Sequence, residues 1–150
     1  MSNYKPDWEI KEIPFTEFLK NCKPVPFVWV DGNGNELEQH LILAGSDGTI
    51  YNADTKHVLK PYSKDAAGHM EVKIKAGDHY KHIAVHILVA TAWLPNPENK
   101  KYVHHINGIA HDNRLINLVW VTFDEHTYLH KLMRKGNKEE YMKEVERLRG

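Results

Sequence analysis

The chain has 150 residues, of which 41% are hydrophobic and 27% are charged, values that fit one globular domain and exclude a wholly disordered chain. Lys and Arg together number 20, as do Asp and Glu, so the protein has no overall cationic field and any nucleic-acid contact must come from a local basic patch. Cys22 is the only cysteine, which excludes a disulfide framework and a cysteine zinc site and fits a reducing compartment. The sequence contains no apolar run of the roughly 18–20 residues that a membrane span needs, and its first residues do not predict a cleaved secretion signal.

The first forty residues carry few structural signals. Residues 16–20 favour a short helix, and residues 27–30 (FVWV) predict a strand followed by a tight turn at residues 31–34 (DGNG). We therefore expect residues 1–40 to form an N-terminal extension.

Residues 41–82 predict a meander of short strands, which we treat as a β-rich module. Residues 41–43 (LIL) are apolar, residues 46–48 (SDG) predict a turn, and residues 49–51 (TIY) are typical of a strand. A further short segment at residues 57–59 (HVL) precedes Pro61. Residues 70–75 (MEVKIK) alternate apolar and polar side chains, the period of a half-buried strand, and residues 76–78 predict the turn that ends it.

The almost wholly apolar run at residues 83–94 is too long for a typical strand and predicts a buried helix ended by Pro95 and Pro97. We expect Trp93 in this run and Trp120 beyond it to be core aromatics. Strands are predicted at residues 102–106, before an Asn-Gly turn, and at 118–122.

A capping box follows the second of these strands, because the Thr122 hydroxyl and the Glu125 carboxylate are three residues apart. It predicts a helix over residues 124–134, interrupted at Gly136. Residues 138–149 are charged, helix-prone and weakly amphipathic. The organisation we expect is an extension (1–40), a β-rich module (41–82), a core (83–135) and a C-terminal helix (136–150).

Histidine is the unusual feature of the composition, with 11 residues, six of them between His86 and His130. A hairpin followed by a helix can bring His104, His105, His126 and His130 together, because positions four apart share one helix face. Two or three imidazoles around one divalent ion, with other positions open, are typical of a catalytic metal site.

The other histidines have simpler interpretations. His79, His82 and His86 also have metal-like spacing, but we expect no metal site there and a structural hydrogen bond for His86. We expect solvent exposure for the remaining four, His40, His57, His69 and His111.

Residues 103–108 (VHHING) and 113–122 (NRLINLVWVT), followed by His126, resemble the HNH endonucleases of phage and intron-encoded type. Weaker matches at residues 46–52, 84–90 and 92–100 extend the resemblance to about residues 45–130. It implies an α+β fold with a ββα-metal core (HNH, His-Me finger), preceded by a small β-rich module and a buried helix.

The resemblance also implies roles for individual residues. His105 stands at the position of the general base, His104 and His126 stand at positions of metal ligands, and the Asn117 side chain would pin the loop between the strands. His130 is a candidate third ligand, as in the three-histidine site of the nuclease colicins. Many relatives carry Asp where this chain has His104; carboxylate ligands favour Mg²⁺, whereas imidazoles move the preference towards Mn²⁺, Ni²⁺ or Zn²⁺. We expect one divalent ion, Mg²⁺ or Mn²⁺ first, with Ni²⁺ and Zn²⁺ as alternatives.

The implied activity is hydrolysis of DNA phosphodiester bonds by an HNH endonuclease. Arg114 and Lys101 are candidates for neutralising nearby phosphates. A basic cluster in the last part of the chain is either a DNA-backbone contact or a solvated helix face; its members are Lys131, Arg134, Lys135 and Lys138.

Homing enzymes of this family often add a C-terminal DNA-recognition domain, and this sequence has room for only one short helix after the motif. We therefore expect cutting of low sequence specificity, or specificity supplied by a protein partner or a second copy in a homodimer. The resemblance further implies a phage-encoded protein that acts in the cytoplasm of a bacterial host, with no membrane partner.

Two other functions stay open from the sequence. One is a non-catalytic DNA- or protein-binding module that kept the ββα fold, which the zero net charge mildly favours. The other is a ribonuclease, because the same base and ion can hydrolyse RNA.

Overall fold

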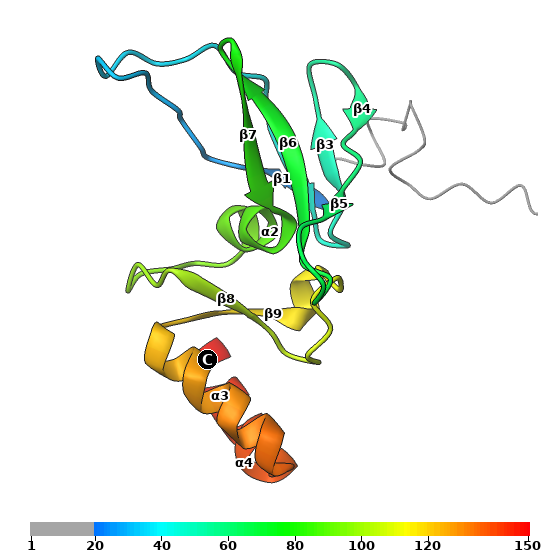
Figure 1. Cartoon of the computed structure of the whole chain (residues 1–150), viewed down its shortest axis with the longest axis vertical. Coiled ribbons are helices and arrows are strands. Elements are labelled where there is room, and N and C mark those ends of the chain that lie inside the picture. Colours follow the sequence, from blue (N-terminus) through cyan, green and yellow to red (C-terminus); the bar gives the residue numbers. More distant parts are fainter. Residues whose placement is uncertain (1–19) are drawn as a thin grey trace, which may run out of the picture.

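The computed structural model describes residues 20–150, and the short helix expected at residues 16–20 lies almost wholly outside them. Two small antiparallel sheets occupy one end of the molecule and a two-stranded hairpin with two helices occupies the other (Figure 1). Helix α2 (Val85–Trp93) lies between the two ends. The first sheet has the order β1-β2-β3-β4, with strands Cys22–Pro24, Ile42–Gly45, Ile50–Asn52 and His57–Val58.

The prediction of a strand at residues 27–30 is wrong. Only an isolated bridge between Val30 and Glu36 forms there, and Val28 and Val30 are exposed. The Trp29 amide donates instead to the Gln39 side chain at 3.0 Å, and the Phe27 amide donates to the Val25 carbonyl at 2.9 Å, so neither amide takes part in a ladder. The turn predicted after it is confirmed, since the Asp31 side chain accepts hydrogen bonds from the amides of Asn33 and Asn35 at 2.8 and 3.0 Å.

The second sheet has the order β5-β6-β7, with strands Tyr62–Ser63, Met70–Ala76 and His79–Ala84. Its central strand, β6, has the predicted alternation, with Val72, Ile74 and Ala76 buried. The apolar run at 83–94 is helical only from Val85, because Ile83 still pairs with Val72 in the sheet.

Helix α2 forms the centre of the main hydrophobic core, in which Leu88, Val89 and Ala90 are fully buried. Trp93 and Trp120 pack against this core, as predicted, and their indole N–H groups donate to the carbonyls of Ala44 and Leu94. Residues of all three sheets contribute to the same core, among them Ile42, Val72, Val103 and Leu118. The β-rich strands are thereby packed onto the hairpin, and the finer division into domains stays a prediction.

The hairpin consists of β8 (Tyr102–His105) and β9 (Leu118–Val121), joined by a loop with a short 3-10 turn at Leu115–Asn117. Helix α3 (Phe123–Lys135) follows β9 and begins with the predicted capping box between Thr122 and Glu125. Helix α4 (Lys138–Arg149) folds back along α3 and β9, and a second core forms between them. The ββα arrangement expected from the sequence is therefore present.

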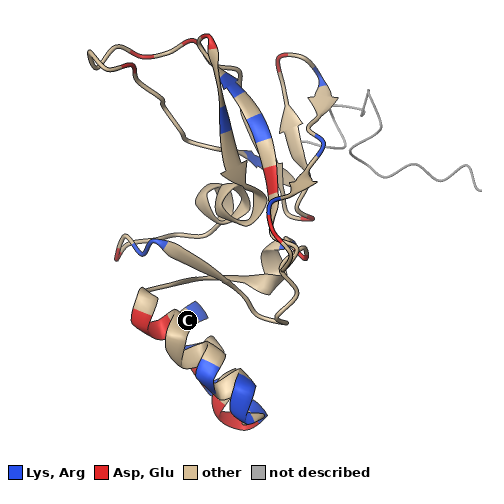
Figure 2. Cartoon of the chain, in the orientation of Figure 1, with Lys and Arg blue, Asp and Glu red and all other residues tan. Residues whose placement is uncertain are grey.

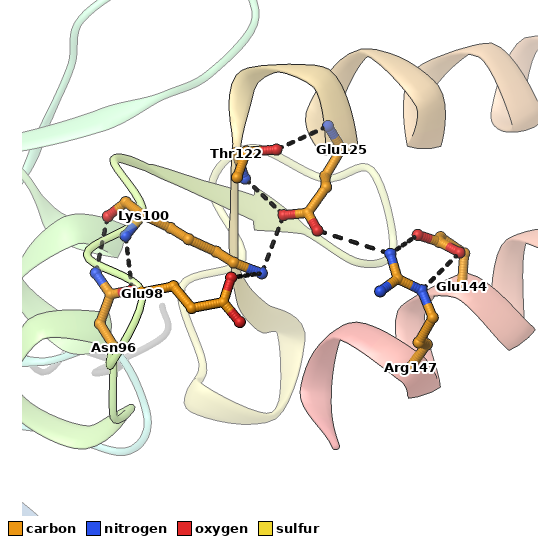
Figure 3. A network of polar contacts seen from close by, with 7 residues as sticks. All are labelled: Asn96, Glu98, Lys100, Thr122, Glu125, Glu144 and Arg147. Atoms are coloured by element: carbon orange, nitrogen blue, oxygen red, sulfur yellow. Dashed lines mark hydrogen bonds and ion pairs between the residues drawn. The ribbon is translucent and has the colours of Figure 1, made fainter.

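A network of polar contacts joins α3 and α4 to the loop after α2 (Figure 3). The Glu125 carboxylate lies 3.0 Å from Lys100 Nζ and 3.6 Å from Arg147 Nη2. Arg147 also contacts Glu144 within α4. Glu125 precedes His126, so the same contacts that cap α3 also fix the first turn that carries this histidine. No helix within residues 20–150 is both long and apolar enough to cross a membrane.

Candidate active site

Three histidines from β8 and α3 converge at one point. His104 lies on β8, and His126 and His130 lie one turn apart on α3, as their spacing predicts. One ring nitrogen from each lies within 4.8 Å of the others, the geometry of a candidate cation site. The Nε2 atoms of His126 and His130 are only 3.0 Å apart. Within residues 20–150, His79, His82 and His86 do not form such a group.

The surroundings of His104 fit a metal ligand. Its side chain is almost fully buried, with a relative exposure of 1%. Its Nε2 lies 2.7 Å from the hydroxyl of Tyr141 on α4, and that hydroxyl donates to the Ile106 carbonyl at 2.6 Å. His104 therefore donates from Nε2, and its Nδ1 carries the lone pair. This Nδ1 is buried with no hydrogen-bond partner among the described residues, and a bound cation would satisfy it.

The protonation state of the cluster also fits. Burial lowers the pKa of His104 to about 3, and repulsion from His130 and His126 adds to the effect. The pKa of His126 and that of His130 are also lowered, again mainly by burial. Metal binding requires neutral imidazoles, so these three side chains are ready to bind a divalent ion at neutral pH.

His105 lies beside the cluster but has a different partner. Its Nε2 is 2.8 Å from Asn113 Oδ1, so Nε2 donates this hydrogen bond and Nδ1 keeps its lone pair. Burial lowers its pKa, an effect that the hydrogen bond to Asn113 opposes. His105 is therefore unprotonated near neutrality, the state that a general base needs.

The Asn117 side chain ties together the loop between the two strands, as the sequence predicts. Its Oδ1 accepts from the Asn107 amide at 2.8 Å, and its Nδ2 donates to the Asp112 carbonyl at 2.9 Å. Arg114, expected near phosphates, forms two hydrogen bonds with the Asp112 carboxylate, at 2.8 and 2.7 Å. This pairing holds the pKa of Asp112 far below its usual range. A phosphate contact by Arg114 stays a prediction.

The three-histidine cluster and His105 line one cavity of about 510 Å³. Lys101, one of the predicted DNA contacts, also lines it, together with Lys64, His69 and His86. The other predicted contacts, Lys131, Arg134, Lys135 and Lys138, are exposed outside the cavity. Basic residues gather towards the C-terminal half of α3 (Figure 2).

The expectations for three of the other histidines differ from the structure. His69 was expected to be exposed but is half-buried in the cavity wall. His86 was expected to form a structural hydrogen bond, yet its Nδ1 is buried without a partner in residues 20–150, with its ring 4.7 Å from that of His105. Of the other three expected exposed histidines, His57 and His111 are exposed, whereas His40 is partly buried against Asn52.

Sequence reasoning also missed two residues that hold the site histidines, Asn113 and Tyr141. The position of Asn113 at the start of the NRLIN segment was the one signal that pointed to it. Tyr141 gave no signal, because its contact with His104 depends on α4 folding back onto the hairpin.

The hairpin and the helices on either side of it are similar to known proteins. Residues 83–128 match the sequence model of the HNH endonuclease family. We refer to these residues as the HNH segment. It contains α2, both hairpin strands and the first turns of α3, and with them His104, His105, Asn117 and His126. His130 and Tyr141 lie beyond it, and His69 lies before it.

Two viral proteins carry related sequences. Both come from Acanthamoeba polyphaga mimivirus and are named uncharacterized HNH endonucleases. One is 35% identical over 91 residues, which cover 60% of this chain and 27% of that protein. The other is 39% identical over 101 residues, which cover 65% of this chain and 24% of that protein. The chain thus spans about a quarter of the length of these relatives.

A solved structure of the HNH homing endonuclease I-HmuI, described as showing DNA binding and cleavage, has a similar fold. The TM-score is 0.54 at 23% sequence identity, over 71% of this chain and 62% of that one. The likeness supports the expected α+β fold with its ββα-metal core.

Proposed function

We propose that the HNH segment is the catalytic centre of a metal-dependent DNA endonuclease. The observation that carries this proposal is one cavity lined both by a three-histidine cation group and by His105, whose Nδ1 is free to accept a proton. An activated water and a Lewis acid are the two requirements of phosphodiester hydrolysis, and these two groups meet them.

In the proposed reaction, His105 Nδ1 takes a proton from a water molecule, whose oxygen forms a bond to the scissile phosphorus. The bond from phosphorus to the 3′ oxygen breaks, and the leaving oxygen takes up a proton from solvent. Asn113 accepts the hydrogen bond from Nε2–H of His105 throughout, which keeps the lone pair of Nδ1 available to the water. A divalent ion bound by His104, His126 and His130 would supply Lewis acidity for the phosphate and the leaving oxygen.

The ligand set bears on the choice of ion. Three neutral imidazoles form a softer set than the carboxylates that Mg²⁺ prefers. Since His130 lies with His104 and His126, the proposal favours Mn²⁺, Ni²⁺ or Zn²⁺ over the Mg²⁺ that HNH relatives with Asp at this position suggest.

DNA is the proposed substrate and partner. Lys64 and Lys101 at the cavity can contact phosphates next to the scissile one. The basic residues in the C-terminal half of α3 (Figure 2) are further candidates for contacts with the DNA backbone. A homodimer or a protein partner as the source of specificity, and action in the cytoplasm of a phage-infected cell, stay predictions.

The test is a plasmid-nicking assay with Mg²⁺, Mn²⁺, Ni²⁺ and Zn²⁺, each with and without chelator. We expect ion-dependent nicking that His105→Ala reduces by about a hundredfold or more. His57→Ala, at an exposed histidine on β4, is the matched control and should nick as the parent does. Undiminished nicking by His105→Ala would refute the assignment of the base.

The same assay separates the two remaining functions. A chelator that lowers the melting temperature, with no ion supporting cleavage of DNA or RNA, identifies a binding module. Cleavage of labelled RNA but not of labelled DNA of the same sequence identifies a ribonuclease.

A further inference from the structure

We infer that His69, held by Asp65, is a second catalytic side chain that donates a hydrogen bond to a non-bridging oxygen of the phosphate in the cavity. This inference rests on the proposed nuclease function. His69 is the last residue of the loop between β5 and β6, directly before β6, and it lies before the HNH segment begins. The β-rich part of the chain would thus supply part of the active site.

His69 lies on the wall of the cavity where the proposed base is. Its ring centroid is 6.0 Å from that of His105 and 5.9 Å from that of His86. The three cation-binding histidines also line this cavity. A phosphate that contacts both the ion and the water held by His105 therefore comes within the reach of His69.

Asp65 fixes the orientation of the His69 ring. Its carboxylate accepts from His69 Nδ1 at 2.9 and 3.2 Å, and its Oδ1 also accepts from the His69 backbone amide at 3.2 Å. Nε2 is then the ring nitrogen that remains for a ligand. With Nδ1 engaged by the carboxylate, an Nε2–H group can donate a hydrogen bond to an oxygen of a phosphate.

Backbone hydrogen bonds make this loop a fixed platform. The Lys64 amide donates to the His69 carbonyl at 2.7 Å, and the Gly68 amide donates to the Asp65 carbonyl at 3.2 Å. Gly68 has a φ of +95°, a conformation that L side chains rarely adopt, so glycine is needed at this turn. The loop is closed by its own hydrogen bonds, which holds His69 in place before a ligand arrives.

The charge of the cavity wall favours an oxyanion. Lys64 and Lys101 contribute positive charge. Among the described residues that line the cavity, Asp65 is the only carboxylate, and it is paired with His69. An anionic ligand meets cations and hydrogen-bond donors there, whereas a second cation would meet only one carboxylate that is already engaged.

The first test compares single-turnover cleavage of plasmid DNA by the parent, His69→Ala and His69→Gln, in the ion that supports nicking. We expect His69→Ala to lower the rate constant by about a hundredfold, the effect of removing one donor to a developing oxyanion. His69→Gln keeps a donor and should recover part of the rate. Affinity for the ion, measured by calorimetry, should stay within about twofold, because His69 is not among its ligands.

Asp65→Asn tests the positioning role. We expect a smaller loss that falls on the single-turnover rate constant rather than on the affinity for DNA, since the amide still contacts the ring without its charge. His79→Ala, at an exposed histidine of β7, is the matched control and should match the parent. Cleavage by His69→Ala at the parental rate, while His105→Ala is inactive, overturns this inference and leaves the proposed function standing.

A second test does not depend on cleavage. Inorganic phosphate is titrated into the metal-free protein while the ring nitrogen signals of His69 are followed by NMR. We expect the Nε2 signal to shift on saturation in the parent and to a lesser extent in Asp65→Asn. An unchanged His69 signal overturns the phosphate contact, and a shifted signal supports it even if no ion makes the parent a nuclease.

Discussion

The hydroxyl of Tyr141 on the last helix lies 2.7 Å from Nε2 of His104 on the first hairpin strand. Burial raises the pKa of Tyr141 to about 12, so the hydroxyl keeps its proton and donates it to the Ile106 carbonyl. His104 must then donate from Nε2, which leaves Nδ1 as the ligand atom. Helix α4 therefore sets the tautomer of a proposed metal ligand, the usual role of outer-shell hydrogen bonds at metal sites.

Tyr141→Phe should weaken metal binding. Loss of an outer-shell partner typically lowers metal affinity by about tenfold to a hundredfold. The variant also leaves His104 Nε2 and the Ile106 carbonyl without their partner, which should reduce the free energy of unfolding by about 1–3 kcal/mol. Calorimetric titration with Mn²⁺ or Ni²⁺ measures the first effect and urea denaturation the second. Tyr128→Phe, at an exposed tyrosine of α3, is the control. Equal affinities in the two variants would contradict this role for α4.

Asn113→Asp should move the pH dependence of cleavage. Burial lowers the pKa of His105 in the parent, so the acid limb of kcat/KM should lie below pH 6.5, the ordinary value for histidine. A carboxylate in place of the Asn113 amide favours the imidazolium and should raise that limb by about one pH unit or more. At pH 6 the variant should therefore be slower than the parent, and the difference should shrink as the pH rises.

The measurement is kcat/KM for plasmid nicking from pH 5.5 to 8.5 in one ion at constant ionic strength. Asn33→Asp adds the same charge in an exposed turn far along the chain and should leave the profile unchanged. Superimposable profiles for Asn113→Asp and the parent would show that Asn113 does not act through His105.

The elements that the sequence predicted well are those specified by neighbouring residues. The capping box at Thr122 and Glu125 fixed the start of α3 to within one residue, and the spacing of His126 and His130 placed them on one face. Helix and strand periods depend on side chains only a few positions apart, so they can be predicted from a single sequence.

The residues that were missed act through contacts between distant parts of the chain. Tyr141 meets His104 only because α4 packs back on the hairpin, and His69 meets His105 only because the second sheet packs on α2. The boundary at Val85 was missed for the same reason, since Ile83 is held in a strand by its partner Val72. Local secondary-structure propensity does not predict contacts between residues that are distant in the sequence.

Gly48→Ala should affect the active site from the first sheet. Gly48 has a φ of +94°, and an added Cβ would lie 3.1 Å from the backbone carbonyl of Asn113. The strained backbone and this contact should reduce the free energy of unfolding by about 1–3 kcal/mol. Because Asn113 holds His105, we also expect slower cleavage at temperatures where the variant is folded.

Urea denaturation and single-turnover cleavage measure the two effects of this change. Gly32→Ala is the control, because nothing lies within 4 Å of the added methyl group and its φ is not positive. A variant at Gly48 that loses stability but cleaves at the parental rate would show that the first sheet does not position Asn113.

His86 should make the metal-free protein sensitive to mild acid. Burial lowers its pKa from 6.5 to about 3, with repulsion from His105 as a further cause. Between these values the unfolded chain binds a proton that the folded protein excludes, so the stability is fully present above pH 6.5 and is lost as the pH falls below it. At pH 5 the loss from this one residue should be on the order of 2 kcal/mol.

The pH dependence of His86→Leu isolates this contribution, because the other histidines titrate in both proteins. With chelator present, urea denaturation at pH 7.5 and pH 5 should show a smaller acid-induced loss in His86→Leu than in the parent, by about 2 kcal/mol. His57→Leu, at an exposed position, should follow the parent at both values. Equal acid-induced losses of stability in His86→Leu and the parent would mean that His86 accepts a proton in the folded state. Its buried Nδ1 would then have a partner at low pH.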